Sequence, residues 1–326
     1  MVEEVIKNVY RIWVVMPKNP LRELNSYFIR GDSSDLLIDT GFRCDESRQA
    51  LAMALDKLGS DPLRRNILLT HLHSDHSGLA NEFVGKGRTV YMSGIDIACL
   101  KDFISDNDDR LRRQRFIMEG FPESELNESY ATNPGKTMAL DYIGDNFYPL
   151  AQGTKLRVGD YLLKTILVPG HSPGNTMFWL ESEKVMFTGD HLLFDVTPNI
   201  MIWPGFEDSL GNYLENLHLV REYPVKLALP GHRNPGNYHT RIDELLIHHE
   251  ERTNEMLKVV QDNPMLNAYE ISSFMTWKIR ANDWRSFPIT QKWFAVGECL
   301  AHLDYLKKLN KILCDTSKTP WRYIAK

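Results

Sequence analysis

The sequence has few cysteines, no long apolar run and no strong excess of either charge. Its four cysteines, Cys44, Cys99, Cys299 and Cys314, lie far apart and form no CxxC pair. This spacing argues against structural zinc held by thiolates and against a disulfide framework. The acidic N-terminus MVEEVIKNVY lacks the apolar core of a signal peptide, and no apolar stretch reaches transmembrane length. We therefore expect a cytoplasmic protein without a membrane segment.

The charge balance and length limit the classes of protein further. A net charge of −5 provides no global basic field for binding nucleic acid. A hydrophobic content of 43% and a charged content of 25% are typical of globular proteins. A chain of 326 residues corresponds to one large domain or two ordinary ones, and it can bury a core without covalent cross-links.

Short strands alternate with helices through the first 240 residues, which is typical of an α/β fold. The stretch at 95–145 is different, because it is rich in charge and has helical periodicity, and we interpret it as a helical insertion. The expected strands are 9–16, 27–30, 36–39, 66–70, 89–92, 155–158, 161–168, 176–180, 185–188 and 226–229. The expected helices outside the insertion are 46–58, 79–84 and 210–222.

The strand pattern stops near residue 240. Helices are predicted at 241–261, 268–277 and 289–310, and a hairpin is predicted from 311–314 and 321–325. Three helices followed by a hairpin are typical of a winged helix, so we expect a catalytic domain at 1–240 and a winged-helix-like domain at 241–326. The second domain has 13 Lys plus Arg and 11 Asp plus Glu, and this net charge of +2 is too small to indicate DNA binding.

The segment THLHSDHSG at 70–78 is the strongest candidate for a site, and it contains His71, His73, Asp75 and His76. Alternate positions of an extended segment share a side, so His71 and His73 are expected to point the same way. A turn after His73 would present Asp75 and His76 to a neighbouring point. Imidazole and carboxylate groups suit zinc and related ions. The alternative is a polar loop with hydrogen-bonded histidines, but four such groups within six residues are costly to bury unpaired.

Three later strand ends add one candidate ligand each. These are His171 in PGHSPGN, Asp190 in FTGDH and His232 in LPGH. Each is also compatible with an ordinary turn, but α/β folds gather their sites at strand ends, and the order of the four segments supports one common site. His191 is interpreted as a supporting or structural residue.

In this order the residues resemble the metallo-β-lactamase superfamily. The resemblance rests on the HxHxDH motif at 71–76 and on the later single ligands, and the strand LIDTG at 37–41 resembles the family's strand-then-aspartate element. It implies an α/β fold, an αββα sandwich, with two divalent metal ions at one edge. Zn²⁺ is the expected metal, and Fe or Mn²⁺ are alternatives.

The resemblance also implies a role for each residue. One metal would be held by His71, His73 and His171, and the other by Asp75, His76 and His232, with Asp190 bridging. Asp39 would support the ligands from behind, or else be an ordinary turn aspartate. A metal-bridging hydroxide would attack a carbonyl or phosphoryl centre, and Asp75 and Asp190 would be the catalytic carboxylates. Asp75 would steer the hydroxide or accept its proton.

Differences from related subfamilies narrow the expected reaction. Asp190 and the lack of a signal peptide argue against an exported antibiotic-degrading enzyme. His73 replaces the glutamate of redox di-iron relatives, which favours hydrolysis. Ser77-Gly78-Leu79 departs from the THxHxDHxGG pattern of glyoxalase II, so the match to that thioesterase is partial.

We expect hydrolysis of a small ester, thioester or lactone. Phe194, Trp203, Phe116 and Met118 are candidates for an apolar substrate pocket, although residues of the insertion could instead pack it onto the domain. One alternative is a nuclease or phosphodiesterase whose winged helix binds nucleic acid. Another is a non-catalytic metal-binding regulatory module. The C-terminal domain is interpreted as a packing or homodimerisation module beside the site.

Overall fold

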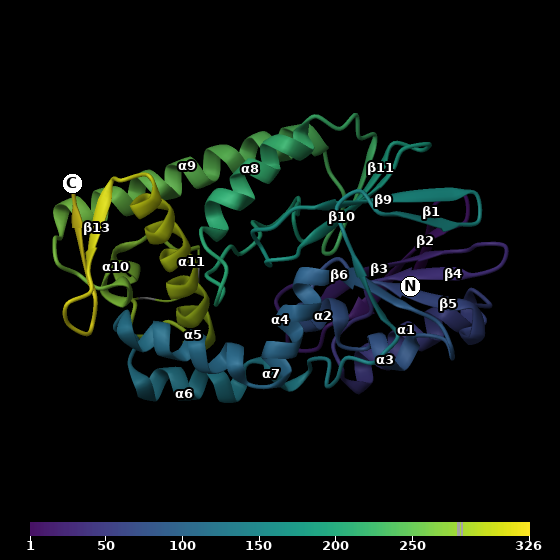
Figure 1. The fold of residues 1–326 in the computed structure, drawn as a ribbon, viewed down its shortest axis with the longest axis horizontal. Coiled ribbons are helices and arrows are strands. Elements are labelled where there is room, and N and C mark those ends of the chain that lie inside the picture. The colour runs from purple at the N-terminus through teal and green to yellow at the C-terminus, as the bar shows by residue number, and fades with distance from the viewer. Residues whose placement is uncertain (279–280, 282) are drawn as a thin grey trace.

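Two β-sheets pack face to face between layers of helices in the computed structural model, which describes residues 1–278, 281 and 283–326 (Figure 1). The strands of the first sheet follow the order of the chain. Neighbouring strands are antiparallel from β1 to β4 and parallel from β4 to β7. They are β1 (Val2–Ile6), β2 (Val9–Val15), β3 (Glu23–Ile29), β4 (Asp35–Ile38), β5 (Arg65–Leu68), β6 (Val90–Ser93) and β7 (Phe147–Leu150).

The second sheet has the order β12-β11-β10-β9-β8. Its strands β11 and β12 are parallel, and the other neighbours are antiparallel. The strands are β8 (Lys155–Val158), β9 (Tyr161–Leu167), β10 (Thr176–Leu180), β11 (Val185–Gly189) and β12 (Leu227–Pro230).

Alternating side chains divide the interior into three hydrophobic layers. Tyr27 in β3 and Phe178 in β10 lie in the cluster between the sheets. Their neighbours point the opposite way, Phe28 into the cluster under the helices of the first sheet and Met177 into the cluster under those of the second. Because successive residues of a strand face opposite sides, each sheet buries both faces, and this produces the four-layered sandwich.

Helices cover the outer face of each sheet. The first sheet carries α1 (Asp45–Lys57) and the turns η1 (Pro62–Arg64), α2 (Ser74–Ser77) and α3 (Ala80–Phe83). The second sheet is covered by α8 (Ser209–Arg221) and by α9 (Tyr238–Asp262), which runs from the sandwich towards the C-terminal hairpin (Figure 1).

The helical insertion packs against the C-terminal segment. Lys292 lies 3.1 Å from the carboxylate of Glu125, and Arg115 lies 3.0 Å from Asp304. The insertion comprises α4 (Gly94–Ile104), α5 (Asn107–Met118), α6 (Glu123–Thr132) and α7 (Pro134–Thr137). The C-terminal segment continues from α9 with α10 (Ala268–Phe274), α11 (Ile289–Lys308), β13 (Ile312–Asp315) and β14 (Arg322–Ala325).

The expected α/β sandwich with a helical insertion and a C-terminal extension is confirmed. The three C-terminal helices and the hairpin lie where they were predicted, and one hydrophobic cluster includes both Leu217 and Ile242, on either side of residue 240. Strands β1 and β7 were not predicted, because both are edge strands with weak alternation and β7 contains Pro149. None of the described helices is both long and apolar enough to cross a bilayer.

Candidate metal centre

The seven predicted ligands meet at one edge of the sandwich, between the two sheets. The segment 71–76 follows β5, and His171, Asp190 and His232 follow β9, β11 and β12. Their potential ligand atoms form three overlapping groups in which all atoms lie within 4.8 Å of one another. These groups are His71, His73 and His171; His71, His76 and Asp190; and Asp75, His76 and His232.

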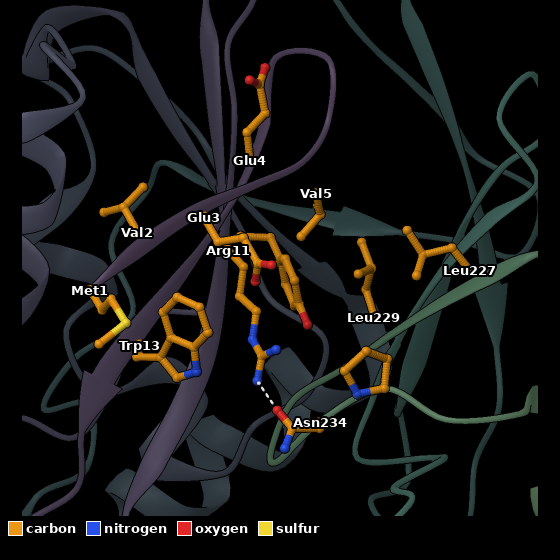
Figure 2. Close-up of a pocket in the computed structure, with 12 residues that line it drawn as sticks. Met1, Val2, Glu3, Glu4, Val5, Arg11, Trp13, Leu227, Leu229 and Asn234 are labelled. Atoms are coloured by element: carbon orange, nitrogen blue, oxygen red, sulfur yellow. Dashed lines mark hydrogen bonds between the residues drawn. The ribbon is translucent and has the colours of Figure 1, made fainter.

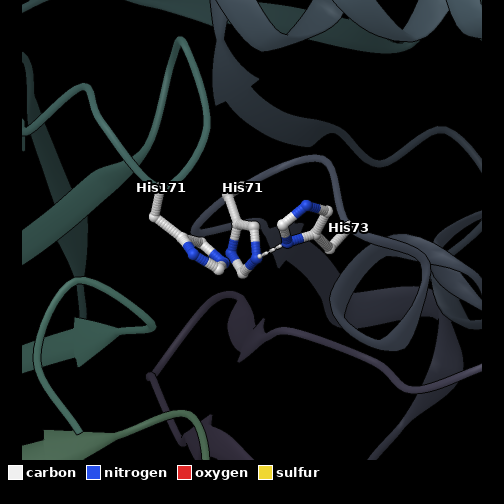
Figure 3. A group of neighbouring side chains, drawn as sticks. All are labelled: His71, His73 and His171. Atoms are coloured by element: carbon white, nitrogen blue, oxygen red, sulfur yellow. Dashed lines mark hydrogen bonds between the residues drawn. The ribbon is translucent and has the colours of Figure 1, made fainter. Parts of the chain in front are cut away.

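The three histidines of the first ligand group, His71, His73 and His171, converge from two loops (Figure 3). The Nε2 of His71 lies 2.9 Å from the Nδ1 of His73. The opposite nitrogen of His71 contacts the Thr70 hydroxyl at 3.0 Å, and the Nδ1 of His171 lies 2.8 Å from the carbonyl oxygen of Asn199. The contacts at Nδ1 orient the rings of His71 and His171. The Nε2 of His71 and the Nδ1 of His73 face each other, and the Nε2 of His171 is buried without a hydrogen-bond partner among the described residues.

The second ligand group consists of Asp75, His76 and His232. The Oδ2 of Asp75 lies 3.2 Å from the Nε2 of His232 and 3.8 Å from the Nε2 of His76. The Nδ1 of His76 lies 2.7 Å from Oδ2 of Asp39, and the Nδ1 of His232 lies 2.9 Å from the carbonyl oxygen of Glu23. Both rings therefore present Nε2 towards the centre.

Asp190 lies between the two ligand groups. Its Oδ1 is 3.4 Å from the Nε2 of His76, and its Oδ2 is 3.5 Å from the Nε2 of His232 and 3.9 Å from the Nε2 of His171. One carboxylate thus faces ligands of both groups, which is the arrangement that a bridging ligand requires.

The donor atoms fit divalent metal ions. Within the part of the chain that the structure describes, the Nε2 atoms of His76, His171 and His232 and the Oδ1 of Asp190 are buried without a hydrogen-bond partner. Unsatisfied buried polar atoms are unfavourable, and a cation would satisfy all four. Imidazole nitrogens combined with carboxylate oxygens are ligands that zinc and related ions accept.

Burial keeps the histidines of the first ligand group neutral. Burial and the surrounding imidazoles hold the pKa of His71 well below its usual value. Burial and the neighbouring His171 lower the pKa of His73 to about 3. The pKa of His171 is also lowered, mainly by burial. These rings need to lose no proton before they bind a cation at neutral pH.

Carboxylates reverse this effect in the second ligand group. Burial alone would lower the pKa of His76, but the carboxylates of Asp190, Asp39 and Asp75 together raise it well above its usual value. The pKa of His232 is raised in the same way, against burial, by Asp190 and Asp75. Burial would raise the pKa of Asp75, but His76 and His232 lower it to about 2.

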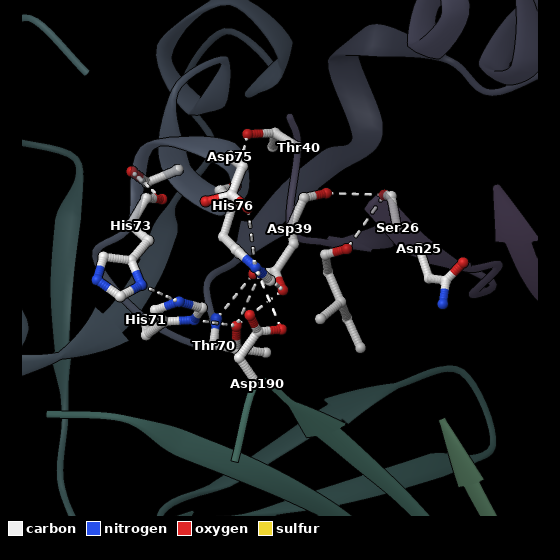
Figure 4. A network of polar contacts seen from close by, with 12 residues as sticks. Asn25, Ser26, Asp39, Thr40, Thr70, His71, His73, Asp75, His76 and Asp190 are labelled. Atoms are coloured by element: carbon white, nitrogen blue, oxygen red, sulfur yellow. Dashed lines mark hydrogen bonds and ion pairs between the residues drawn. The ribbon is translucent and has the colours of Figure 1, made fainter. Parts of the chain in front are cut away.

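Asp39 lies beside the predicted ligand His76 and contacts Thr70, which precedes His71 (Figure 4). Its Oδ1 accepts the backbone N–H of Thr70 at 2.8 Å. Its Oδ2 contacts the Thr70 hydroxyl at 2.8 Å and the Nδ1 of His76 at 2.7 Å. The side chain therefore orients one histidine directly and the loop of another through Thr70.

The other predicted site residues lie in different places. His191 is buried against Tyr213, with ring centroids 5.0 Å apart, and belongs to none of the three ligand groups. The indole N–H of Trp203 donates to the carbonyl oxygen of His171 at 3.1 Å, and its ring centroid is 5.6 Å from that of His73. Trp203 thus lies beside the first ligand group.

Trp203 also lines a cavity of about 710 Å³ between α5, the loop 202–208 and the end of α11. Phe194, Phe116 and Met118 are not among the residues that line this cavity. Phe194 packs against Gly236, and Phe116 is fully buried, stacked on Trp293. The carbonyl oxygen of Met118 accepts the N–H of Trp321.

Two polar residues of the centre's surroundings were not singled out from the sequence. Asp96, in the first turn of α4, bonds to both loops of the first ligand group. Asn25, in β3, bonds to the turn that carries His232. The pattern Ser93-x-x-Asp96 signals a helix start, and the Ser93 hydroxyl does cap α4, but it gives no indication of the distant partners.

The family model described as the metallo-beta-lactamase superfamily matches residues 20–232. The chain is 23% identical over 282 residues to a beta-lactamase-like protein 2 homolog of Caenorhabditis elegans, covering 83% of this chain and 78% of that protein. It is 25% identical over 232 residues to an atrochrysone carboxyl ACP thioesterase of Aspergillus novofumigatus. That match covers 71% of this chain but only 56% of the fungal protein.

Among solved structures, the chain resembles a metallo-beta-lactamase family protein from Thermus thermophilus. The TM-score is 0.83 with 28% sequence identity, and the match covers 99% of this chain and 100% of the other. The similarity thus includes the insertion and the C-terminal segment as well as the sandwich.

Proposed function

This chain belongs to the metallo-β-lactamase superfamily, and from that premise we propose that it binds two divalent metal ions and hydrolyses a small ester, thioester or lactone. His71, His73 and His171 would hold one ion, and Asp75, His76 and His232 the other. Asp190 would contact both. Zn²⁺ is the proposed metal, with Fe or Mn²⁺ as alternatives.

The observation that carries this proposal is the set of atoms that are buried without a hydrogen-bond partner among the described residues. Three Nε2 atoms and one carboxylate oxygen point to the same place, and each of the three rings is oriented by a contact at its Nδ1. A polar loop without a metal would satisfy such atoms internally. Their arrangement supports a metal site whose ligands are oriented before the ion binds.

Two bound ions would supply a water of lowered pKa as nucleophile and an electrophile for the substrate's acyl oxygen. The chain's own residues would complete the reaction. Asp75 is more exposed than the other carboxylate of the centre, at 16% against 9% for the side chain of Asp190. We propose that Asp75 accepts the proton of the nucleophile, while Asp190 positions the two halves of the centre.

The proposed acyl substrate is supported by the cavity beside Trp203. Four cationic side chains line it, but each pairs with a carboxylate, so the cavity does not provide a basic strip for a nucleic-acid backbone. The pairs are Arg112 with Asp108, Arg115 with Glu119 and Asp304, Lys307 with Asp304, and Lys308 with Asp208. The thioesterase name of the fungal relative also favours acyl chemistry.

We propose that the segment 241–326 is a winged-helix-like module that forms a wall of the substrate cavity. Asp304, Lys307 and Lys308 of α11 lie in the cavity lining. The same helix contacts α6 of the insertion through Lys292 and Glu125. This packing supports a structural role for the module in preference to a role in binding nucleic acid.

The test combines metal analysis with two substrate classes. Purified wild-type protein is expected to contain about two metal ions per chain and to hydrolyse an aryl ester or thioester faster than a bis-aryl phosphodiester. The variant Asp190→Ala should lose metal and reduce hydrolysis by at least about 100-fold, because it removes the contact to both ligand groups.

Asp195→Ala is the matched control, because Asp195 is exposed and lies only five residues away. It should retain wild-type metal content and rate. Preference for the phosphodiester would replace the acyl proposal with the nuclease or phosphodiesterase alternative. A wild-type chain that binds metal but hydrolyses neither substrate class would support the regulatory module.

A further inference from the structure

The carboxylate of Asp96 joins the two loops that carry the first ligand group. Its Oδ2 accepts the N–H of Leu72 at 2.9 Å and the hydroxyl of Ser172 at 2.8 Å, and its Oδ1 accepts the N–H of Gly174 at 2.6 Å. Leu72 lies between two of the histidines, and Ser172 follows the third. One side chain thus fixes the two loops that carry His71, His73 and His171 relative to each other.

The first turn of α4 favours a carboxylate at this position, and among the described residues the other groups that bond to it all belong to the two ligand loops. Asp96 is fully buried, and it forms no ion pair with any residue that the structure describes. All three of its contacts are donors from the two ligand loops. At Gly174 an added Cβ would lie 2.8 Å from Oδ1 of Asp96 and 2.6 Å from its backbone nitrogen, so the loop can approach only as glycine.

A different side chain holds the turn that carries His232. The amide of Asn25 donates to the carbonyl oxygens of Pro230 at 3.0 Å and Arg233 at 2.7 Å, on both sides of this histidine. The backbone N–H of Asn25 also donates to the carbonyl oxygen of Gly231 at 2.7 Å. Three bonds from one residue of β3 therefore fix a turn of the second sheet.

Arg11 reinforces this contact from the neighbouring strand. Its Nε donates to Oδ1 of Asn25 at 2.9 Å, and its Nη2 donates to the carbonyl oxygen of Arg233 at 2.6 Å. The guanidinium lies 4.5 Å above the ring of Trp13 and contacts Asn234 at the edge of a cavity of about 770 Å³ (Figure 2). The amide orientation of Asn25 is thereby determined, because its oxygen must face Arg11.

These two networks share no residue, and each contacts a different ligand group. We infer that Asp96 and Asn25 are separate positioning residues for the two metal ions, so that either ion can be lost while the other stays bound. The inference rests on the proposed function, because it requires two metal positions. Neither side chain contacts a ligand atom, and both act through the loops that present the histidines.

Isosteric exchanges test the two networks in parallel. Asp96→Asn places an amide N–H against donors, and Asn25→Asp places a carboxylate against two carbonyl oxygens. Each should weaken zinc binding at its own position by about 10- to 100-fold and change the other by less than about threefold. Titration of the metal-free protein with zinc ions, against a chelating competitor, measures both affinities.

X-ray absorption spectroscopy of the one-zinc forms identifies which position is retained. The ion left in Asp96→Asn should have the two imidazole ligands of the second ligand group. The ion left in Asn25→Asp should have the three imidazoles of the first. A purely structural role would lower stability without this difference in ligand number.

Further variants distinguish a specific loss of zinc affinity from misfolding. Ser172→Ala removes part of the Asp96 network, and Arg11→Gln removes part of the Asn25 network. Each should weaken zinc binding at the position that its network supports by about three- to tenfold. Asp35→Asn changes another buried carboxylate, which accepts the N–H of Gly31 at 3.1 Å at the far end of β4, and should change neither affinity.

Equal weakening of both positions in either variant, or no weakening in either, would overturn the inference. So would a retained ion with the opposite number of imidazole ligands. Wild-type protein that binds no metal would refute the proposed function together with this inference. Two ions in the wild type with unselective variants would refute the inference alone.

Discussion

The two ligand groups of the centre are neighbours, but they differ in charge. The first ligand group contains three imidazoles that burial keeps neutral. The second contains a carboxylate, and its two histidines have raised pKa values because Asp190 and Asp75 face them. Without metal, the first ligand group carries no charge, whereas the second combines histidines of raised pKa with carboxylates.

This difference separates two ways to prepare a metal site. Neutral imidazoles bind a cation without losing protons, but they have no charge to attract it. Protonated imidazoles are attracted to the neighbouring carboxylates in the absence of metal, although their Nε2 atoms form no well-directed hydrogen bond with any described residue, and a cation must displace their protons. If two ions bind as proposed, their affinities should therefore respond differently to substitution and to pH.

The largest effect is expected for Gly231→Ala. An added Cβ would lie 2.5 Å from Oδ1 of Asp190 and 2.8 Å from Cε1 of His76, neither of which can move without leaving the centre. We expect metal affinity in the second ligand group to fall by more than about 100-fold, and the free energy of unfolding to fall by about 2–3 kcal/mol. Zinc titration and chemical denaturation measure the two quantities.

Gly94→Ala is the control for this substitution, because its added Cβ would meet only the side chain of Pro149, at 3.3 Å. It should have little effect on either quantity. Normal affinity at both positions in Gly231→Ala would contradict the close approach of the turn to the second ligand group.

Asp39→Asn is expected to have the next largest effect. Asp39 has a φ of 57°, a conformation that asparagine tolerates, so the backbone should be retained. The carboxylate of Asp39 offers two acceptor oxygens to Thr70 and His76, whereas the side-chain amide of asparagine offers one. Affinity should fall about 10- to 100-fold in the second ligand group, and less in the first, which Asp39 reaches only through Thr70. A larger loss of affinity in the first ligand group would show that Asp39 mainly supports that group instead.

The pH dependence of zinc binding should differ between the groups. Below the raised pKa values of His76 and His232, protons occupy these rings, so affinity in the second ligand group should rise by about tenfold per pH unit for each proton displaced. The first group should be nearly constant from about pH 6 to 8, because its rings are already neutral.

Titrations at several pH values, with calorimetry in two buffers of different ionisation enthalpy, count the displaced protons. Proton release should accompany binding of the ion at the second ligand group. Identical pH slopes for the two ions would show that the charge difference between the groups has no consequence for binding.

The smallest effect is expected for Trp203→Phe. The ring against His73 is largely kept, but the indole N–H that donates to the carbonyl oxygen of His171 is lost. One hydrogen bond contributes about 1 kcal/mol, so affinity at the first ligand group should fall by about three- to fivefold. The second group should be unaffected, and an equal change in both would argue for a general loosening of the centre.

The sandwich could be predicted from the sequence because its signals are local. Alternation in β2, β9 and β10 and the turns between them are visible within a few residues. The edge strands β1 and β7 were not predicted, because each pairs with only one neighbouring strand and its sequence can therefore include charged residues or proline. The packing of Phe116 against Trp293 could not be predicted, since no local pattern indicates contacts between the insertion and α11.

The residues that meet at the candidate centre could be singled out from the sequence for a similar reason. Each lies in a segment that follows a strand, and residue type and order are both visible in the sequence. The positioning residues could not be singled out in this way, because Asp96 lies 24, 76 and 78 positions from the donors that it accepts. Asn25 is 205 and 208 positions from its two carbonyl acceptors. Only the folded chain brings these partners together.

Neither sheet carries a complete ligand set. Each ligand group takes members from the loop after β5 and one histidine from a loop of the other sheet. A bound ion would therefore cross-link the two sheets, and its binding free energy would be available only to chains whose sheets are correctly docked. Removal of the metal would then make separation of the two sheets easier, and metal-free chains would be cleaved faster by proteases.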